Sequence, residues 1–507
     1  MSPRKERERA PVALLHVADR TGIVEFAHAL LELGFELVAT GPTATALRQS
    51  GARHRSLSEF TGERLPADAL ALLHPKLLGA IAAEKPGIDL VAVNFYPLAE
   101  AAADASLSQD EVLAYVDPAG PSLLRAAARN FKSVIALCDP ADYAQALATL
   151  KAYDRMLPDR RQALAAKAFH SAAYYDSTVA QYLGGKWEQF PDEVVIALKK
   201  SADLRYGENP HQSGAFYTLA GARPRGLNAA RVVHGQPLAY GHYLDLEIAW
   251  DLASGFARPA CAVVKLGAPA AFAAAADAAR AARRACACDP RGAFRATAAL
   301  NREVDEKAAQ ALAEETLNCV AAPDFTPKAL QTLKAKKDVR LVVLPPSLLA
   351  PHELDVRAVA GGMLVQERDQ RAYQDGFKTA SRRSPTEAER AALDVAWRVA
   401  MRARSHAAVL ARGEAAIGVG AGQTSRLDAV RLALVKSQER HPILAADEPL
   451  VLASDGALTA EHVEAAAEGG VTAIAHPGGA AEDADAARAA DRFGVALVGA
   501  GLRHFRL

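Results

Sequence analysis

The sequence predicts an α/β protein with two regions: a smaller N-terminal one built on a doubly wound parallel sheet, and a larger C-terminal one of the same class. Through the first 150 residues, short apolar runs alternate with helical patterns, which is typical of parallel strands covered by helices on both faces. Similar strand-like runs recur from residue 200 onward. A hydrophobic share of 50% and a charged share of 23% over 507 residues fit a globular chain of about three or four compact units.

The first region begins with the apolar run Val12–Val17, which predicts a buried strand. Apolar residues then recur at helical spacing from Ile23 to Leu33, and Gly34 ends that pattern. Three further apolar runs predict the remaining strands of this sheet: Phe35–Thr40, Asp89–Phe95 and Val134–Cys138.

A long helical pattern over residues 158–185 separates the two regions. The second region contains strand-like runs at Ala262–Val264, Leu341–Leu344, Ile417–Val419, Leu450–Ala453, Val471–Ala475 and Val495–Val498. One strand is followed by Gly-Ala-Pro (267–269) and another by His-Pro-Gly-Gly (476–479), a loose similarity that suggests two related halves. We therefore predict a first domain over residues 1–150, a helical connector over 151–199, and two halves over 200–370 and 371–507.

Charge balance and cysteine content exclude several classes of function. The 59 basic and 59 acidic side chains cancel, which argues against binding nucleic acid or an anionic membrane by bulk electrostatics. The five cysteines form no even framework and no signal peptide is recognisable, so we expect a cytoplasmic protein. Cys286 and Cys288 lack a second Cys/His pair at zinc-binding spacing, and no apolar stretch reaches the roughly 18–20 residues of a membrane span. No metal, nucleic-acid or membrane partner is expected.

Two loops after the first two strands predict an anion site. In parallel sheets, ligands bind at the carboxyl ends of strands, where loop amides and helix N-termini face anions. Asp19–Gly22 and Thr40–Thr43 both occupy this position, although ordinary strand-to-helix turns have a similar composition. The candidate phosphate contacts are Arg20, Thr40, Gly41 and Thr43, with the ammonium of Lys76 from a later loop.

A phenol and a carboxylate are candidates for proton transfer in the same region. Tyr96 follows a buried strand, and Asp117 lies in a proline-rich turn before a helix that carries Arg129. Side chains of these types on converging loops can act as acid and base. Either could equally serve as a structural hydrogen-bonding group.

Two polar segments of the second region predict ligand binding. Leu204–Gln212 gathers a guanidinium, a phenol, a carboxylate, amides and an imidazole around Gly and Pro, more hydrogen-bonding capacity than a surface loop requires. Gly420–Arg426 combines backbone that a ligand can approach closely with side-chain donors. The candidate contacts are Arg205, Tyr206, Asn209, His211, Gln423 and Arg426.

Together these motifs resemble one family, the bifunctional AICAR transformylase/IMP cyclohydrolase of purine biosynthesis. The resemblance runs in order from Leu14–Gly22 to Arg503–Phe505, and Arg205–Gln212 and Gly420–Arg426 carry its most specific strings. It implies a methylglyoxal-synthase-like first domain that closes formyl-AICAR to IMP. It also implies two cytidine-deaminase-like halves that transfer a formyl group from 10-formyltetrahydrofolate to AICAR. Such proteins are homodimers and need no metal.

The resemblance also assigns roles to single residues. It places Tyr96, Asp117 and Lys265 at catalytic positions, puts Arg129 where the family has a lysine, and adds Arg503 to the substrate contacts. The family's Lys-His-x-Asn-Pro motif reads Lys265-Leu266-Gly267-Ala268-Pro269 here, so the imidazole that takes the proton during formyl transfer is missing. His406 stands where a second Asn is expected and is considered as a relocated base.

Two interpretations therefore remain open. The chain could carry out one or both family reactions. Alternatively, it could be a catalytically impaired or inactive paralogue that keeps the fold, the dimer surface and nucleotide binding. Such a paralogue would act as a sensor, as the heterodimer partner of an intact copy, or in a specialised pathway. His16, Arg295 and His406 are polar side chains at positions where the family pattern has others.

Overall fold

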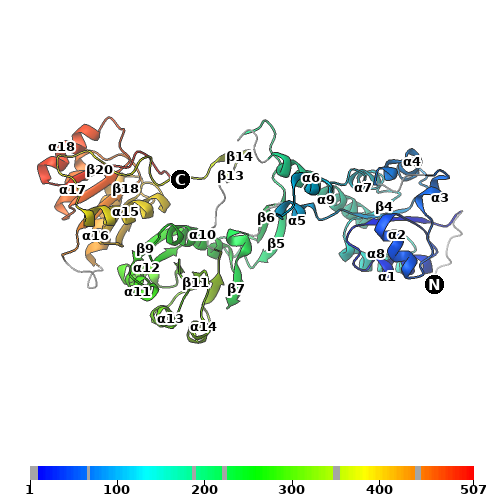
Figure 1. The fold of residues 1–507 in the computed structure, drawn as a ribbon, viewed down its shortest axis with the longest axis horizontal. Helices are drawn as coiled ribbons and strands as arrows, with labels where there is room; N and C mark the ends of the chain where they lie inside the picture. Colours follow the sequence, from blue (N-terminus) through cyan, green and yellow to red (C-terminus); the bar gives the residue numbers. More distant parts are fainter. Residues whose placement is uncertain are drawn as a thin grey trace. The chain divides into compact units, whose positions relative to one another are not determined.

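The computed structural model describes residues 9–64, 69–104, 106–184, 190–219, 225–345, 354–439 and 447–507 (Figure 1). The chain forms two compact units. Unit 1 extends to Ser201 and includes a short return of the chain from Tyr217. Unit 2 comprises Ala202–Phe216 and the remainder of the chain to Leu507.

Unit 1 is built on a four-stranded sheet in the order β2-β1-β3-β4. All neighbours are parallel, as predicted. The strands are β1 (Val12–Val17), β2 (Glu36–Ala39), β3 (Leu90–Asn94) and β4 (Ile135–Leu137). Every residue of β3 is buried. Strands that are covered on both faces need apolar side chains at successive positions, which is why continuous apolar runs predicted these strands.

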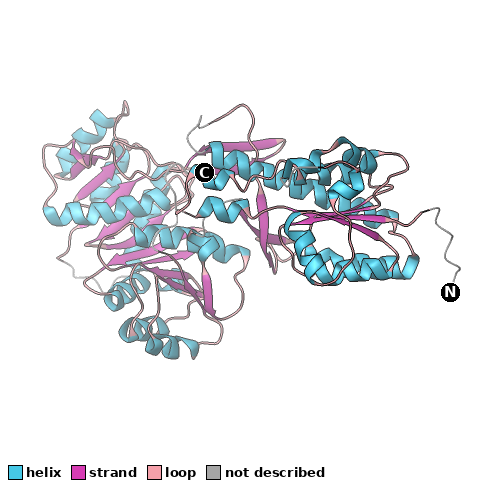
Figure 2. Cartoon of the chain, turned by 45° about the vertical axis from the view of Figure 1, so that its right-hand side comes forward, coloured by secondary structure: helices cyan, strands magenta, loops and turns pink. Residues whose placement is uncertain are grey.

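Helices cover both faces of this sheet, which confirms the doubly wound arrangement (Figure 2). One face packs against α1 and α8, through residues such as Phe26 and Tyr143, whose rings stack at 4.3 Å. The other packs against α4 and α7, through Leu77 and Leu123. The helices are α1 (Ile23–Glu32), α2 (Gly41–Gln49), α3 (Leu57–Thr61), α4 (Pro75–Ala82), α5 (Leu98–Ala103), α6 (Gln109–Leu113), α7 (Gly120–Arg129), α8 (Tyr143–Tyr153) and α9 (Pro158–Gly184), with 3-10 turns η1 (Ala69–Leu73) and η2 (Pro140–Asp142).

The long helix predicted over residues 158–185 is α9, whose last described residue is Gly184. A two-stranded sheet follows, formed by β5 (Leu198–Leu204) and β6 (Gly214–Leu219). The polar segment Leu204–Gln212 is therefore the connection of a hairpin.

Unit 2 is built on one twelve-stranded sheet in the order β15-β20-β19-β18-β16-β17-β9-β8-β10-β11-β12-β7. Its strands are β7 (Arg231–His234), β8 (Ala260–Lys265), β9 (Ala268–Ala274), β10 (Thr297–Leu300), β11 (Cys319–Ala322), β12 (Arg340–Val343), β15 (Lys378–Thr379), β16 (Ala408–Arg412), β17 (Ala415–Gly420), β18 (Leu450–Ser454), β19 (Ala473–His476) and β20 (Ala496–Gly499). A separate hairpin consists of β13 (Leu354–Val359) and β14 (Gly362–Glu367).

The sheet order shows that unit 2 consists of two equivalent halves. In the first half the hairpin β8–β9 is followed by β10, antiparallel to β8, and then by the parallel strands β11 and β12. In the second half β16–β17, β18, β19 and β20 repeat this pattern. The halves join where β9 pairs antiparallel with β17.

The repeat corrects one detail of the sequence comparison. Ala268 begins β9 inside the β8–β9 hairpin, whereas His476 ends β19. The counterpart of β19 is β11, so segments 267–269 and 476–479 are not equivalent. The true relation appears in α10 (Tyr240–Ser254) and α15 (Glu387–Arg402), which each precede a hairpin and each bury a tryptophan, Trp250 and Trp397.

Helices cover both faces of this sheet as well. They are α10 (Tyr240–Ser254), α11 (Ala278–Cys288), α12 (Pro290–Ala293), α13 (Glu306–Ala313), α14 (Pro327–Lys334), α15 (Glu387–Arg402), α16 (Arg426–Glu439), α17 (Ala460–Glu468) and α18 (Asp483–Phe493), with the 3-10 turn η3 (Gly226–Ala229). Within the described ranges no helix is long and apolar enough to cross a bilayer.

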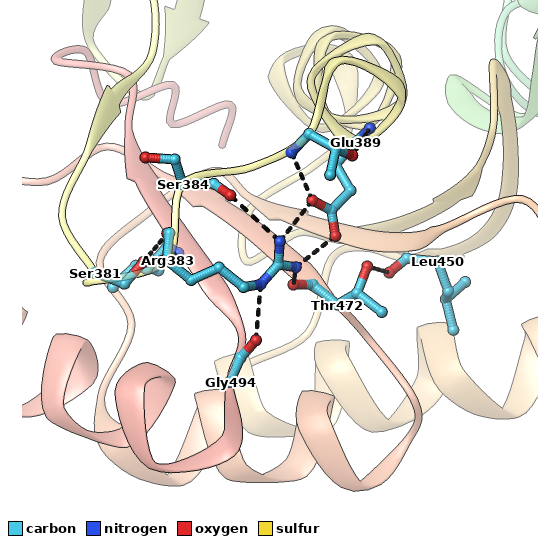
Figure 3. A network of polar contacts seen from close by, with 9 residues as sticks. Ser381, Arg383, Ser384, Glu389, Leu450, Thr472 and Gly494 are labelled. Carbon is cyan, nitrogen blue, oxygen red and sulfur yellow. Dashed lines mark hydrogen bonds and ion pairs between the residues drawn. The ribbon is translucent and has the colours of Figure 1, made fainter.

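A polar network ties the start of α15 to the sheet of the second half (Figure 3). The guanidinium of Arg383 donates to both carboxylate oxygens of Glu389, at 2.5 and 2.9 Å. It also donates to the backbone oxygens of Thr472 (2.5 Å) and Gly494 (2.8 Å). One arginine thus links the helix to segments about 80–110 residues further along the chain.

Candidate functional site

The carboxyl edge of the unit 1 sheet, where its strands end, is held together by Asn94. The amide oxygen of Asn94 accepts hydrogen bonds from the backbone N–H groups of Ala18 (2.7 Å) and Asp19 (2.8 Å), and its amide nitrogen donates to the Asp19 oxygen. The loop after β1 is thereby fixed beside the end of β3. The sequence did not lead us to predict Asn94 as a site residue, although its position at the end of a buried strand was a usable signal.

The threonines predicted to contact phosphate have different environments. Thr43 is fully buried, and its hydroxyl both accepts from the N–H of Val17 (2.9 Å) and donates to the Val17 oxygen. Thr40 is half-buried, and its hydroxyl lies 2.7 Å from Nδ1 of His16. Gly41 begins α2 with a φ of 53°, and Arg20 is exposed in the first loop. Thr40 is therefore better placed than Thr43 to meet a ligand.

Asp117 is a buried carboxylate with one bonded and one unbonded oxygen. Its Oδ1 accepts from the N–H groups of Ala119 (2.9 Å) and Gly120 (2.8 Å), and its own N–H donates to the hydroxyl of Tyr175 (2.7 Å). Oδ2 is buried and has no hydrogen-bond partner among the described residues. It lies so close to Gly120 that a side chain there would clash. The carboxylate is thus held in one orientation.

His16 interacts electrostatically with this carboxylate. Burial lowers the pKa of the imidazole, and the negative charge of Asp117 partly opposes that shift. A neutral imidazole with a hydroxyl at 2.7 Å and a carboxylate within electrostatic range can accept or pass on a proton. His16, Thr40 and Asp117 therefore form an acid–base cluster, named here the His16 cluster.

The remaining candidates of unit 1 are less closely associated. Tyr96 follows β3 at the same edge and is 39% exposed. Lys76 bonds to the Thr61 oxygen (2.8 Å) and pairs with Glu63 (2.7 Å). Arg129 is the last residue of α7, about 14 Å along the helix from its start near Asp117, at 1.5 Å per residue. The structure does not bring Arg129 beside Asp117 within this unit.

One edge of the unit 2 sheet collects the candidates of the second region. Because β17 runs antiparallel to β9, the end of β17 at Gly420 lies on the same side as the start of β9 at Ala268. Gly420 also pairs with Ala408, which pairs with Ser454 at the end of β18. The hairpin at Lys265 and the loops after β17 and β18 therefore open at one edge.

A buried ion pair organises this edge in the second half. Arg426 pairs with Asp455 and donates to the hydroxyl of Ser454 (2.8 Å), and Asp455 also accepts from Ser405 and from the N–H of Ala407. Arg426 is 9% exposed and Asp455 is fully buried. Arg426 was predicted from its residue type as a ligand contact, but its guanidinium already has two protein partners. Asp455 was not predicted as a site residue.

His406 lies between Ser405 and Ala407, which both bond to Asp455, and the ring of Phe505 is near both Arg426 and Arg503. The N–H of His406 donates to the Gln423 oxygen (3.1 Å), and Nδ1 of His406 is buried without a partner among the described residues. The ring of Phe505 faces the guanidinium of Arg503 at 4.2 Å and lies 6.2 Å from the imidazole. An aromatic face and an unbonded imidazole nitrogen are thus available here.

The hairpin at Lys265 offers different chemistry. The ammonium of Lys265 donates to the Phe294 oxygen (2.7 Å), and Leu266 is 90% exposed with a left-handed φ of 54°. Asp245 on α10 accepts from the N–H of Gly267 (2.7 Å), and burial raises the pKa of its carboxyl to about 6. Asp245 is therefore a titratable group beside the hairpin that sequence reasoning did not identify.

Most of the segment Leu204–Gln212 is exposed, although Gly207 is buried, and the hydrogen bonds of Asn209 are local. The backbone N–H and the side-chain amide of Asn209 both donate to the side chain of Gln212 at 2.9 Å. The guanidinium of Arg205 lies 5.9 Å from the ring of Tyr206. His211 is exposed at the tip of the hairpin connection.

The fold and these sites define a class: a two-unit α/β protein with one candidate site at the sheet edge of a small parallel domain and a second candidate site in a duplicated mixed sheet. The chain belongs to the AICARFT/IMPCHase bienzyme family, whose model matches residues 127–436. The model of the MGS-like domain matches residues 22–116. Both matches agree with the resemblance and with the fold class predicted from the sequence.

Several bacterial relatives match over nearly their full length, each named bifunctional purine biosynthesis protein PurH. The protein of Myxococcus xanthus is 38% identical and covers 98% of this chain and 100% of its own. The protein of Sorangium cellulosum is 39% identical over 97% of this chain and 99% of its own. The protein of Chloroflexus aurantiacus is 40% identical over 98% of this chain and 99% of its own. A solved structure described as ForH is 32% identical, covers 34% of this chain and 99% of that chain, and has a TM-score of 0.31.

Proposed function

We propose that this chain acts in IMP synthesis, as its family does, with ring closure of formyl-AICAR to IMP as its principal reaction and formyl transfer to AICAR impaired. The observation that carries this proposal is Asp117, a fixed carboxylate with one unbonded buried oxygen that interacts electrostatically with His16, which in turn contacts Thr40. Tyr96 follows β3 at the same sheet edge and supplies a phenol.

Ring closure requires groups that the His16 cluster contains. The carboxamide nitrogen forms a bond to the formyl carbon, and the formyl oxygen leaves as water with one proton from the carboxamide and one from the formamide nitrogen. Asp117 Oδ2 is suited to accept a proton, and the neutral imidazole of His16 to pass one on. Thr40 and the loop amides after β1 and β2 would hold the nucleotide phosphate.

Purified full-length protein should convert formyl-AICAR to IMP, and Asp117→Asn should reduce this rate by at least about a hundredfold. Asp139→Asn is a matched control, because Asp139 also accepts a backbone N–H in a turn (2.9 Å) but lies on the connection after β4. Background rates in the wild type, or equal loss in both variants, would contradict the proposal.

Formyl transfer from 10-formyltetrahydrofolate to AICAR is the second reaction we propose to test, and a specific observation favours its impairment. Leu266 has no group that could accept a proton at the hairpin of Lys265, and the guanidinium of Arg426 already forms an ion pair with Asp455. We expect AICAR to bind without measurable formyl transfer. The double variant Leu266→His/Ala268→Asn should raise the transfer rate by roughly 10²–10⁴, the usual contribution of a positioned acid or base. If the wild type transferred the formyl group and the double variant did not increase that rate, formyl transfer would not be impaired at Leu266.

The candidate contacts of unit 2 can be examined with the same protein. We propose that Lys265, Gln423, Arg503 and His406 contact AICAR or the folate at this sheet edge, and that Arg205, Tyr206, Asn209 and His211 add contacts from the hairpin connection. A cytoplasmic homodimer, or a heterodimer with an intact paralogue, is part of the same proposal. Light scattering of the purified chain, alone and with such a paralogue, distinguishes the two assemblies.

A further inference from the structure

A cavity of about 400 Å³ lies at the amino edge of the unit 1 sheet, where the strands begin. Its lining includes residues just before three of the strands: Pro11, Phe35 and Asp89. The His16 cluster lies at the opposite, carboxyl edge. Small-molecule pockets typically measure about 300–1,000 Å³, so this cavity can hold a ligand that is distinct from the substrate of the proposed reaction.

Three arginines line the cavity, and one of them is neutralised by the protein itself. Arg9 forms two hydrogen bonds with the carboxylate of Asp89, at 2.9 and 3.1 Å. Asp89 also accepts from the N–H of Val12 (2.8 Å). Its charge is therefore already compensated by Arg9.

Arg161, in the first turn of α9, differs from Arg9. Its Nε donates to the Met156 oxygen (3.3 Å), while its Nη1 is buried with no hydrogen-bond partner among the described residues. Burial lowers the pKa of this guanidinium, and the negative charge of Asp89 partly opposes that shift. An arginine stays charged in proteins, so an unpaired buried Nη1 is costly unless an acceptor enters.

Arg155 adds a second available cation at the mouth of the cavity. It is exposed, and the described residues offer it no hydrogen bond or ion pair. Asp154 is the only other carboxylate of the lining, so the cavity keeps an excess of one positive charge: three arginines against Asp89 and Asp154. The remaining wall is largely apolar and includes Phe35, Leu150 and Met156.

We propose that this cavity binds a small organic phosphate, with the phosphate on Arg155 and Arg161 and the uncharged part against the apolar wall. A phosphate monoester carries about −1.5 to −2 charges at neutral pH and offers three acceptor oxygens, enough for two guanidiniums at once. A carboxylate offers two oxygens and a single charge, which matches the two arginines less well.

Calorimetric titration of the full-length protein with phenyl phosphate and with inorganic phosphate tests this site. We expect the double variant Arg155→Gln/Arg161→Gln to lose one equivalent of phenyl phosphate binding, or to bind it at least tenfold more weakly. Arg160→Gln should match the wild type, because Arg160 is an exposed neighbour on α9 outside the cavity lining. The comparison separates this cavity from any phosphate bound at the carboxyl edge.

Three results would overturn the proposal. One is no binding of either phosphate by the wild type, and another is unchanged affinity and stoichiometry in the double variant. The third is equally tight binding of phenol or benzoate, since the cavity would then select neither charge nor phosphate.

Thermal unfolding supplies a second measurement. In phosphate-free buffer, Arg161→Gln should unfold close to the wild-type temperature, because the side chain loses only the long hydrogen bond from Nε to the Met156 oxygen (3.3 Å) while Nη1 has no partner among the described residues. Phosphate should raise the unfolding temperature of unit 1 in the wild type more than in the variant. A variant that unfolds much earlier without phosphate would show a structural role for Arg161 and contradict the assignment.

Discussion

His16 is a half-buried imidazole in contact with the hydroxyl of Thr40 and within electrostatic range of the Asp117 carboxylate. Burial lowers its pKa in the folded protein below the 6.5 of a free histidine. Below pH 6.5 the unfolded chain therefore binds a proton that the folded chain excludes, so this residue makes the protein less stable as the pH falls. We expect His16→Gln to lose less stability than the wild type between pH 7.5 and 5.5.

Urea unfolding at several pH values measures this difference. Other buried histidines, such as His242 and His476, titrate in the same direction but are present in both proteins, so they cancel in the comparison. His28→Gln, at an exposed position on α1, is the matched control. Parallel stability profiles of the wild type and His16→Gln would refute the predicted effect.

Gly456 leaves room for the guanidinium of Arg426 at the candidate site of unit 2. A methyl group at this position would overlap the guanidinium, which is held by Ser454 and Asp455. We expect Gly456→Ala to destabilise the protein by roughly 1–3 kcal/mol, because Arg426 must move away from a fully buried carboxylate. Gly241→Ala, on α10 with no atom near the added methyl, should be neutral or stabilising by up to about 1 kcal/mol. Equal unfolding free energies of the two variants would contradict this.

At the scale of elements, the start of α15 depends on one carboxylate. Glu389 is 3% exposed; burial alone would raise its pKa, but hydrogen bonds from Arg383, Thr472 and the Thr386 N–H lower it to about 2 (Figure 3). The pKa of this carboxyl in the unfolded chain is 4.5. The ionised carboxylate therefore stabilises the folded protein fully above pH 4.5, and this stabilisation, about 3 kcal/mol in all, is lost as the pH falls toward 2.

Removing this carboxylate has a defined consequence. Glu389→Gln should lower the unfolding free energy by roughly 2–4 kcal/mol at pH 7, because Arg383 loses its counter-charge. The variant should also lose less stability than the wild type below pH 4.5. Glu387→Gln, an exposed residue of the same first turn, is the control. A similar loss in both variants at pH 7 would show that the network of Arg383 contributes little.

Some of the strands could be predicted from the sequence, and their partners could not. β1, β3, β17 and β18 are apolar runs and were found within one or two residues, whereas the alanine-rich strands β9, β10, β11 and β16 were not predicted. The order of the twelve strands depends on pairs such as β9 and β17, which lie about 140 residues apart and leave no local signal.

The same limit applies to the candidate sites. Thr43, Lys76 and Arg426 were chosen as ligand contacts from their residue types, but protein groups 26, 15 and 29 residues away occupy their hydrogen bonds. Residue type reports what a side chain can bind, and only the fold reports what it already binds. Asp245 and Asp455 became visible only through their burial and their partners.

At the scale of the whole molecule, the two units have separate hydrophobic cores. Leu30 lies in a core formed by unit 1 alone. Leu246 of α10 and Leu393 of α15 lie in one core that both halves of unit 2 share, on one face of the twelve-stranded sheet. The halves of unit 2 are therefore expected to unfold together, and unit 1 on its own.

Leucine-to-alanine variants test this cooperativity, because all three side chains are fully buried and each replacement should cost about 2–5 kcal/mol. In scanning calorimetry of the full chain, Leu30→Ala should lower the temperature of one transition. Leu246→Ala and Leu393→Ala should both lower that of the other, although the two residues belong to different halves. If the last two variants shifted different transitions, the pairing of β9 with β17 would not couple the halves. If all three shifted a single transition, the units would unfold as one.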